Sequence, residues 1–99
     1  MLVELTGKQK RFLRSMGSTL EPIVQIGKGG VAESVVVSAA DALLARELIK
    51  VRVLQNCAQQ PKAAIAALAE LSGAELVQVI GRNGLLYKQN PEKSKIELP

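Results

Sequence analysis

Apolar residues along this chain change repeatedly from helical to strand spacing, and this alternation restricts the folds that it can adopt. In three segments they recur at three- and four-residue intervals, and shorter apolar or alternating runs lie between and after those segments. The 99 residues leave room for one domain of the usual size, about 100–150 residues. The order helix–strand–helix–strand–helix–strand–strand predicts an α/β fold, a two-layer sandwich with one mixed four-stranded sheet.

The first helix is predicted from a capping box, in which the Thr6 hydroxyl accepts from the backbone of Gln9 and the Gln9 side chain reaches back. The helix should run from Gly7 to Ser15 or Met16 and end near Gly17. At 100° per residue it has an apolar side and a basic side. The apolar side comprises Gln9, Phe12, Leu13 and Met16, and the opposite side Lys10, Arg11 and Arg14.

Proline and glycine bound the remaining elements. Pro22 suits the first position of a strand, Pro61 the first turn of a helix and Gly73 a helix end. Asn83-Gly84 predicts a hairpin turn over residues 81–84. The predicted strands are 22–26, 48–55, 74–80 and 85–89, the second and third helices 31–45 and 61–72, the domain 1–90, and a polar tail 91–99.

The residue types that are missing exclude several chemistries. Without histidine the chain cannot form a Ser-His-Asp triad, a Cys-His dyad or a histidine-ligated zinc site. Cys57 is the single cysteine, so it can form no internal disulfide, and we interpret it as a small core or edge residue in a reducing compartment. Phe12 and Tyr87 are too few aromatic residues for a base-stacking platform. No carboxylate pair or metal cluster stands out, so we expect no enzyme, no metal and no cofactor.

Targeting signals are not evident. The first residues, MLVELTGKQKR, hold only a short apolar stretch interrupted by Glu4, which does not resemble a signal peptide. No window approaches the roughly 18–20 apolar residues that span a bilayer. We therefore expect a soluble, cytoplasmic protein with no membrane partner, and a monomer.

Positive charge is concentrated near the N-terminus. The net charge is +4, and residues 1–30 account for +3 because five cations there oppose two acids. Residues 82–99 have +2, whereas residues 31–49 have −2. Such asymmetry is what a polyanion-binding face requires. Lys50 and Arg52 alternate with buried positions and could extend such a face, but the favoured interpretation is that they protect an exposed sheet face.

The segment Gly27-Lys28-Gly29-Gly30 separates an apolar strand from a helix. Glycines there permit positive φ and close approach of another backbone, and a helix N-terminus favours anions. Lys28 adds a full charge, so the loop could clamp a phosphodiester backbone, although a plain strand-to-helix turn has the same pattern.

The P-loop motif for nucleotide binding does not match this segment. Gly27, Gly29 and Ala32 satisfy GxGxxA with Glu47 twenty residues on, but Glu47 precedes the second strand instead of following it, so dinucleotide binding is the weaker interpretation.

The run LTGKQKRFLRSMGSTLEPIVQIGKGG, residues 5–30, resembles the opening of the CRM domain (chloroplast RNA splicing and ribosome maturation), the bacterial YhbY family. The resemblance continues through Glu47–Val51, Val77–Gly81 and Leu85–Tyr87 and so covers nearly the whole chain. One departure is Ser15–Ser18, where relatives often have an Ala-His pair. The resemblance implies a fold similar to the C-terminal domain of translation initiation factor three, with a KH-like GxxG loop.

The same resemblance implies RNA binding without catalysis. Single-domain bacterial members associate with precursors of the large ribosomal subunit, and plant members with several copies promote group II intron splicing. The expected function is thus assistance in ribosome assembly, with ribosomal RNA as the partner. Two alternatives remain, a nucleotide- or small-molecule-binding protein that uses the glycine loop and a module that docks on ribosomal proteins. The residues implied in RNA contact are Gly27, Lys28, Gly29 and Gly30, with Lys8, Lys10, Arg11 and Arg14.

Overall fold

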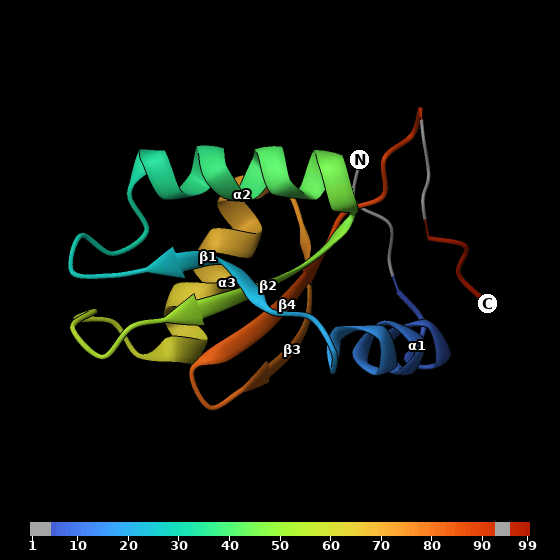
Figure 1. Cartoon of the computed structure of the whole chain (residues 1–99), viewed down its shortest axis with the longest axis horizontal. Coiled ribbons are helices and arrows are strands. Elements are labelled where there is room, and N and C mark those ends of the chain that lie inside the picture. The colour runs from blue at the N-terminus through green and yellow to red at the C-terminus, as the bar shows by residue number, and fades with distance from the viewer. Residues whose placement is uncertain (1–4, 93–95) are drawn as a thin grey trace.

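The elements follow the predicted order and form a mixed four-stranded sheet with helices on its two faces (Figure 1). The computed structural model describes residues 5–92 and 96–99, so the predictions on the first four residues and on Lys93 and Lys95 lie outside the described residues. The sheet order is β1-β2-β4-β3, with β1 parallel to β2 and both other pairs antiparallel. The helices are α1 (Gly7–Gly17), α2 (Glu33–Arg46) and α3 (Pro61–Ser72), and the strands are β1 (Pro22–Ile26), β2 (Leu48–Val53), β3 (Glu75–Ile80) and β4 (Asn83–Tyr87).

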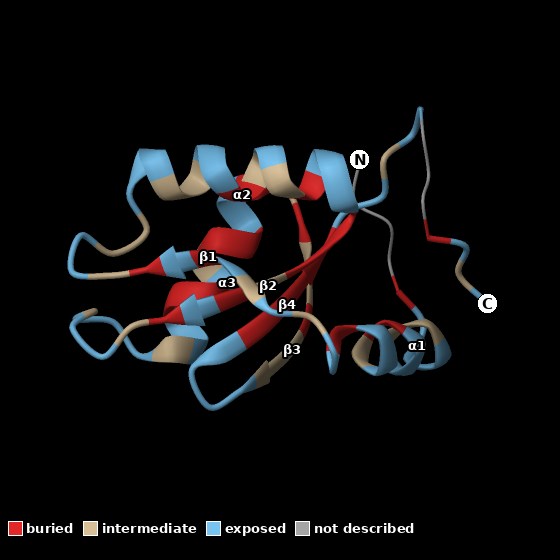
Figure 2. Ribbon diagram, in the orientation of Figure 1, coloured by how far each residue is buried: buried red, intermediate tan, exposed pale blue. Residues whose placement is uncertain are grey.

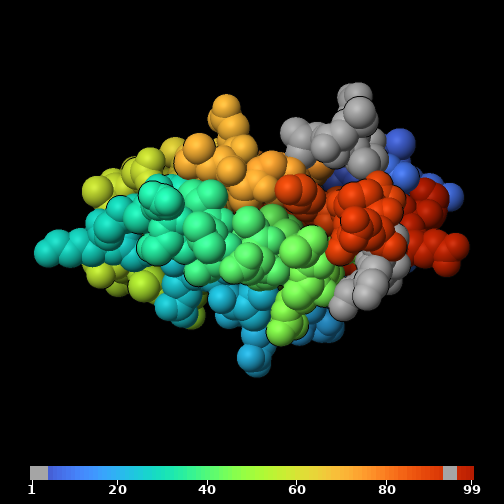
Figure 3. Space-filling view, turned by 90° about the horizontal axis from the view of Figure 1, so that it is seen from above, coloured from blue at the N-terminus to red at the C-terminus, as the bar shows by residue number. Residues whose placement is uncertain are grey.

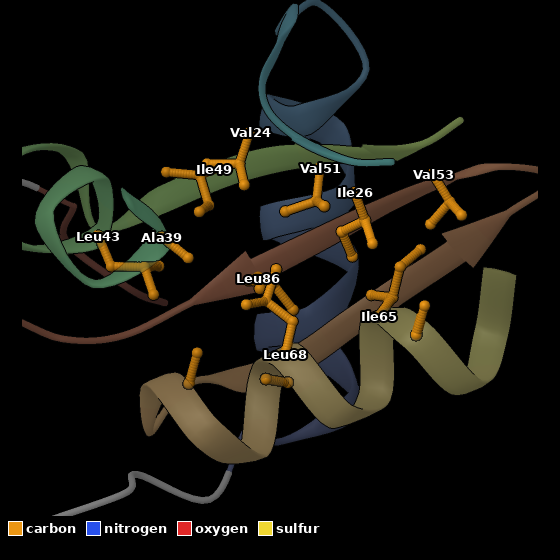
Figure 4. Close-up of a cluster of buried hydrophobic side chains, with 13 residues drawn as sticks. Val24, Ile26, Ala39, Leu43, Ile49, Val51, Val53, Ile65, Leu68 and Leu86 are labelled. Atoms are coloured by element: carbon orange, nitrogen blue, oxygen red, sulfur yellow. The ribbon is translucent and has the colours of Figure 1, made fainter. Parts of the chain in front are cut away.

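The main core lies between the sheet and helices α2 and α3, which together make the predicted two-layer sandwich. Alternate strand residues, among them Ile26, Val51 and Leu86, point toward these helices and meet Leu43 and Leu68 (Figure 4). All five side chains are almost fully buried. Figure 2 shows the buried residues concentrated in the strands and on the sheet-facing sides of the helices. The short strands predicted from apolar runs are therefore the inner surface of this core.

A second, smaller cluster lies on the opposite face of the sheet, where α1 packs. Leu13 of α1 meets Leu48 of β2 and Leu85 and Tyr87 of β4. Because successive strand residues point to opposite faces, β2 and β4 are buried on both sides at this end. Helix α1 contacts β2, β3 and β4 at this end, whereas Arg52, Ile80 and Asn83 at the other end of the strands remain exposed.

The helix ends form as the sequence predicts. The Thr6 hydroxyl accepts from the Gln9 amide at 3.1 Å, and the Gln9 side-chain oxygen accepts from the Thr6 amide at 3.0 Å, which completes the capping box. Gly73 adopts φ 73° and ends α3, and Pro61 occupies its first turn. Residue type thus determines these boundaries locally.

Two predicted boundaries near the glycine loop are wrong. Helix α2 begins at Glu33 instead of Val31, because Gly30 has φ 69° and the Ala32 amide donates to the Gly30 carbonyl, which makes a turn before the helix. Strand β2 ends at Val53 instead of Gln55, because the Cys57 amide donates to the Leu54 carbonyl in a turn. In both cases a tight turn occupies residues that the pattern of apolar residues assigns to the adjoining helix or strand.

The hairpin prediction is also displaced. Ile80 pairs with Asn83, so the two central turn residues are Gly81, with φ 57°, and Arg82. A positive φ at the first central position is the arrangement of a type II′ turn. Strand β4 consequently spans Asn83–Tyr87 instead of the predicted 85–89. Asn83-Gly84 belongs to the strand, where the missing side chain of Gly84 leaves room for Ile65 of α3.

Glu47 joins α2 to the segment that follows β4. It is fully buried, has φ 65° at the end of α2, and its carbonyl accepts from the Lys88 amide. Its carboxylate accepts from the Asn90 amide at 2.6 Å and from the Ile96 amide at 2.8 Å. Ile96 is buried in the second cluster, so part of the segment predicted as a polar tail packs on the domain, and the boundary at residue 90 stays a prediction.

We expect Gly84→Ala to destabilise the fold. A Cβ there would lie 2.6 Å from Ile65 Cγ2 and 2.8 Å from Ile65 Cδ1, both in the main core. Overpacking of this kind costs about 1–3 kcal/mol. Urea unfolding followed by circular dichroism measures the loss. Gly7→Ala is the matched control because, among the described residues beyond its chain neighbours and its own helix backbone, no atom lies within 4 Å of the new Cβ. An equal loss in both variants would contradict the packing argument.

Ionisation of the Tyr87 phenol should destabilise the folded protein at alkaline pH. Burial, and secondarily the Glu47 carboxylate, raise the pKa of its phenol above the ordinary 10.0. The folded protein then holds its proton where the unfolded chain loses it, so the free energy of unfolding falls as pH rises above 10.0. Tyr87→Phe should remove this part of the alkaline loss. It should cost less than about 1 kcal/mol at neutral pH, because the hydroxyl has no hydrogen-bond partner among residues 5–92 and 96–99.

Ultraviolet titration of this single tyrosine checks the pKa directly, since phenolate absorbs where phenol does not. A midpoint at or below 10.0 would refute the prediction.

Candidate functional site

The glycine-rich loop is a tight turn that protrudes from one end of the molecule (Figures 1 and 3). The Gly30 amide donates to the Gly27 carbonyl at 2.9 Å, so Lys28 and Gly29 are the central residues of the turn. Both are exposed, and no atom lies within 4 Å of the position of a Cβ on Gly29. The turn therefore presents the Lys28 side chain and open backbone to a ligand in solution.

Helix α2 contributes less to anion binding at this loop than the sequence suggests. Its N-cap is Ala32, which makes no side-chain hydrogen bond, so the first amides lack a side-chain cap. However, Glu33 stands in the first turn and places a carboxylate at the positive end of the helix dipole. An anion at this helix end would meet that carboxylate, so Lys28 and the turn itself are the attractive elements.

A second loop, residues 54–60, lies beside the glycine turn. The Leu54 amide donates to the Ile26 carbonyl at 2.9 Å, and positions for a Cβ on Gly27 and Gly30 fall 3.7 Å from Asn56 Oδ1 and 3.5 Å from Gln59 Oε1. The sequence analysis did not identify the side-chain amides of Asn56 and Gln59 as part of the site. The signal was available, because the carboxyl ends of adjacent parallel strands meet at one edge of a sheet.

The basic residues of α1 lie at the other end of the molecule from the glycine turn (Figure 1). Lys8 and Arg11 are exposed, and Lys10 and Arg14 are half-buried. The opposite side of α1 is buried less completely than predicted, since Leu13 is inaccessible but Phe12 and Met16 each keep 38% exposure. The structure thus does not bring the two predicted halves of the site into contact.

Strand β2 connects the two regions through Lys50 and Arg52. Lys50 pairs with Leu85, which packs under α1, so Lys50 and Arg52 point to the α1 face of the sheet. Lys50 and Arg14 line one depression beside the end of α1. Arg52 pairs with Gln25, two residues before the glycine turn begins. Basic side chains therefore extend from α1 along β2 toward the turn.

Glu47 cannot serve a ligand held by the glycine turn. It precedes β2, whereas the turn lies at the other end of that strand, and six residues at ~3.3 Å each separate them by about 20 Å. Its carboxylate also binds the amides of Asn90 and Ile96. The ribose-binding role in a dinucleotide motif is therefore excluded for this residue.

Cys57 packs half-buried against the main core, as predicted. Within residues 5–92 and 96–99, no three histidine, cysteine or acidic side chains are grouped so that they could hold a metal ion. No helix in that part of the chain has the length and apolar character to cross a membrane.

The fold and the turn define a small α/β domain that presents a lysine-bearing glycine loop at the carboxyl end of its parallel strands. The family model of the CRS1 / YhbY (CRM) domain matches residues 5–88, so the chain belongs to this family, as its sequence indicates.

Relatives and a solved structure agree with this assignment. The chain is 54% identical over 95 residues to the "Probable RNA-binding protein YqeI" of Bacillus subtilis, covering 96% of this chain and 99% of that one. It is 36% identical over 98 residues to an "RNA-binding protein" of Haemophilus influenzae, covering 99% and 98%. The solution structure of a hypothetical protein from Staphylococcus aureus, described as a candidate RNA-binding protein, superposes with a TM-score of 0.81 at 49% identity, covering 97% of this chain and all of that one.

Gly30→Ala should strain the glycine turn, whereas Gly29→Ala should not. Gly30 has φ 69°, a conformation that costs an L-residue about 1–2 kcal/mol. Gly29 has no positive φ and an open Cβ position. Urea unfolding should therefore show a loss of that size for the first variant and less than about 0.5 kcal/mol for the second. Equal stability of both variants would mean that the turn does not require its left-handed residue.

Proposed function

We propose that this protein binds RNA through the glycine turn, residues 27–30, with the basic side chains of α1 on neighbouring phosphates. The observation that supports this most is the exposed turn with Lys28 at its tip, in a chain whose relatives are named RNA-binding proteins. Backbone amides and a lysine at a glycine-rich turn can grip a phosphodiester backbone closely. The proposed contacts are Gly27, Lys28, Gly29 and Gly30, with Lys8, Lys10, Arg11 and Arg14.

The separation of the turn from α1 favours a long polyanion over a single nucleotide. The molecule measures 37 Å along the axis on which they lie at opposite ends. A duplex strand advances about 3.4 Å per phosphate in DNA, so one nucleic acid of on the order of ten nucleotides reaches from end to end. Lys50 and Arg52 would continue the contact between the two regions. A mononucleotide could touch only one of them.

Ribosomal RNA in precursors of the large subunit is the proposed partner, and assistance in subunit assembly in the cytoplasm the proposed role. The resemblance to single-domain CRM proteins supports this choice. Phosphate contacts dominate the proposed interface, and the chain has a single tyrosine, a single phenylalanine and no tryptophan for stacking. Sequence preference should therefore be low and the dependence on salt steep.

Salt titration tests the loop contact. Four neutralised phosphates on a single strand predict a slope of log affinity against log salt near −3. Lys28→Ala should reduce that slope by about one unit and leave stability unchanged, because the side chain is exposed. Lys88→Ala is the matched control, since its ammonium lies by the Ser72 carbonyl at the end of α3. An unchanged slope in the Lys28 variant would show that the turn makes no phosphate contact.

Sedimentation tests the cellular partner. The protein should comigrate with large-subunit precursors in a sucrose gradient at low salt, and high salt should release it. Combining Lys28→Ala with Arg11→Ala should weaken comigration at low salt, whereas Lys88→Ala should not. Migration at the top of the gradient under every condition would refute ribosome association. Comigration that survives nuclease treatment would favour docking on ribosomal proteins instead.

A further inference from the structure

A depression beside α1, on the same face of the sheet, offers more than phosphate contacts. It has a volume of about 350 Å³ and lies between the C-terminal end of α1 and strands β2, β3 and β4. Six side chains that matter for its chemistry line it, namely Arg14, Lys50, Gln78, Ile80, Asn83 and Leu85. We propose that this depression binds one unpaired base of the RNA, an inference that rests on the RNA-binding function proposed above.

Strand pairing arranges the lining in two rows. Lys50, Leu85 and Gln78 face one another across three strands, and Arg52, Asn83 and Ile80 form the next row. Paired side chains lie on the same face, about 4.5–5.5 Å apart at Cβ. The first row is partly covered by α1, with Leu85 buried as its floor, whereas the second row is exposed. The depression is therefore bounded on one side by the end of α1 and is open on the other side, over the exposed second row.

An irregularity in β3 places Gln78 on this face. The pairing of β3 with β4 shifts between Leu76 and Gln78, so Val77 is an extra residue. Leu76 and Val79 pack on the main core, and Val77 packs under α1. Strict alternation from Leu76 would turn Gln78 into the main core, and the bulge turns it into the depression instead.

The lining matches the surfaces of a base. Ile80 is 64% exposed and Leu85 forms an apolar floor, so both can contact the flat face of a ring. The amides of Gln78 and Asn83 each offer donors and an acceptor, which suits the hydrogen-bonding edge of a base.

The positive charge of the depression favours a nucleotide, which has phosphates, over an uncharged aromatic ligand. Arg14 and Lys50 are cations, and no carboxylate is among the described residues that line the depression. Arg52 lies next to the depression, paired with Asn83. These cations can hold the phosphates that flank the base. A paired base remains stacked within its helix and cannot enter, so the site selects unpaired RNA.

The test removes the amides without changing charge. The variant combines Gln78→Ala with Asn83→Ala, and the matched control is Gln89→Ala, an exposed amide away from this depression. The probes are a single-stranded oligoribonucleotide and a fully paired RNA duplex. We expect the double variant to bind the single strand about three- to tenfold more weakly, with an unchanged salt slope, and to bind the duplex as the unaltered protein does. Photocrosslinking of a 4-thiouridine-bearing single strand should label the peptide containing Ile80.

Three results would overturn the inference. Equal losses on the single strand and the duplex would point to general damage or phosphate contact, and urea unfolding of the double variant separates these two causes. No loss on either probe, with Lys28→Ala still weakening both, would reject the base site while the proposed function stands and would leave this face for a protein partner. No binding of either RNA by the unaltered protein would reject the proposed function and this inference together.

Discussion

Burial of the two central strands on both faces is the constraint on which the rest of this structure depends. Strand β2 directs Ile49, Val51 and Val53 into the main core and Leu48 into the cluster beneath α1. Because α1 is short and covers only one end of its face, β2 also leaves Lys50 and Arg52 toward solvent. The same strand thus stabilises two apolar clusters and places basic side chains between α1 and the glycine turn. In β2, therefore, the residues that stabilise the fold alternate with residues of the proposed interface.

Glu47 illustrates how a polar group can support such a small domain. A buried carboxylate is costly unless it is hydrogen-bonded, and this one accepts from two amides of the segment after β4. Glu47 also adopts a positive φ, a backbone conformation that is uncommon for residues other than glycine. Together these features close the end of the molecule opposite the glycine turn. Leu5 and Ile96 pack in the cluster at α1, away from the glycine turn (Figure 1).

Most of the fold could be predicted because its signals are local. The capping box at Thr6, the stop at Gly73 and the alternation in β2 each depend on neighbours in sequence, and all three form as predicted. Errors arose where the decisive contact is distant or where a turn displaces a helix start. Asn83-Gly84 has the composition of a turn, but Gly84 is required for the approach of Ile65 from α3. A motif of two residues cannot distinguish these two uses of glycine.

The sequence by itself determined the order of elements, the basic first helix, the glycine turn and membership of the CRM family. These follow from residue types at short spacing, which can be recognised without any tertiary contact. Only the tertiary structure decided that the turn and α1 lie at opposite ends and that a bulge turns Gln78 outward. Each of these depends on strand pairing or on which face a helix covers. Such relations join residues far apart in the chain, and no local pattern encodes them.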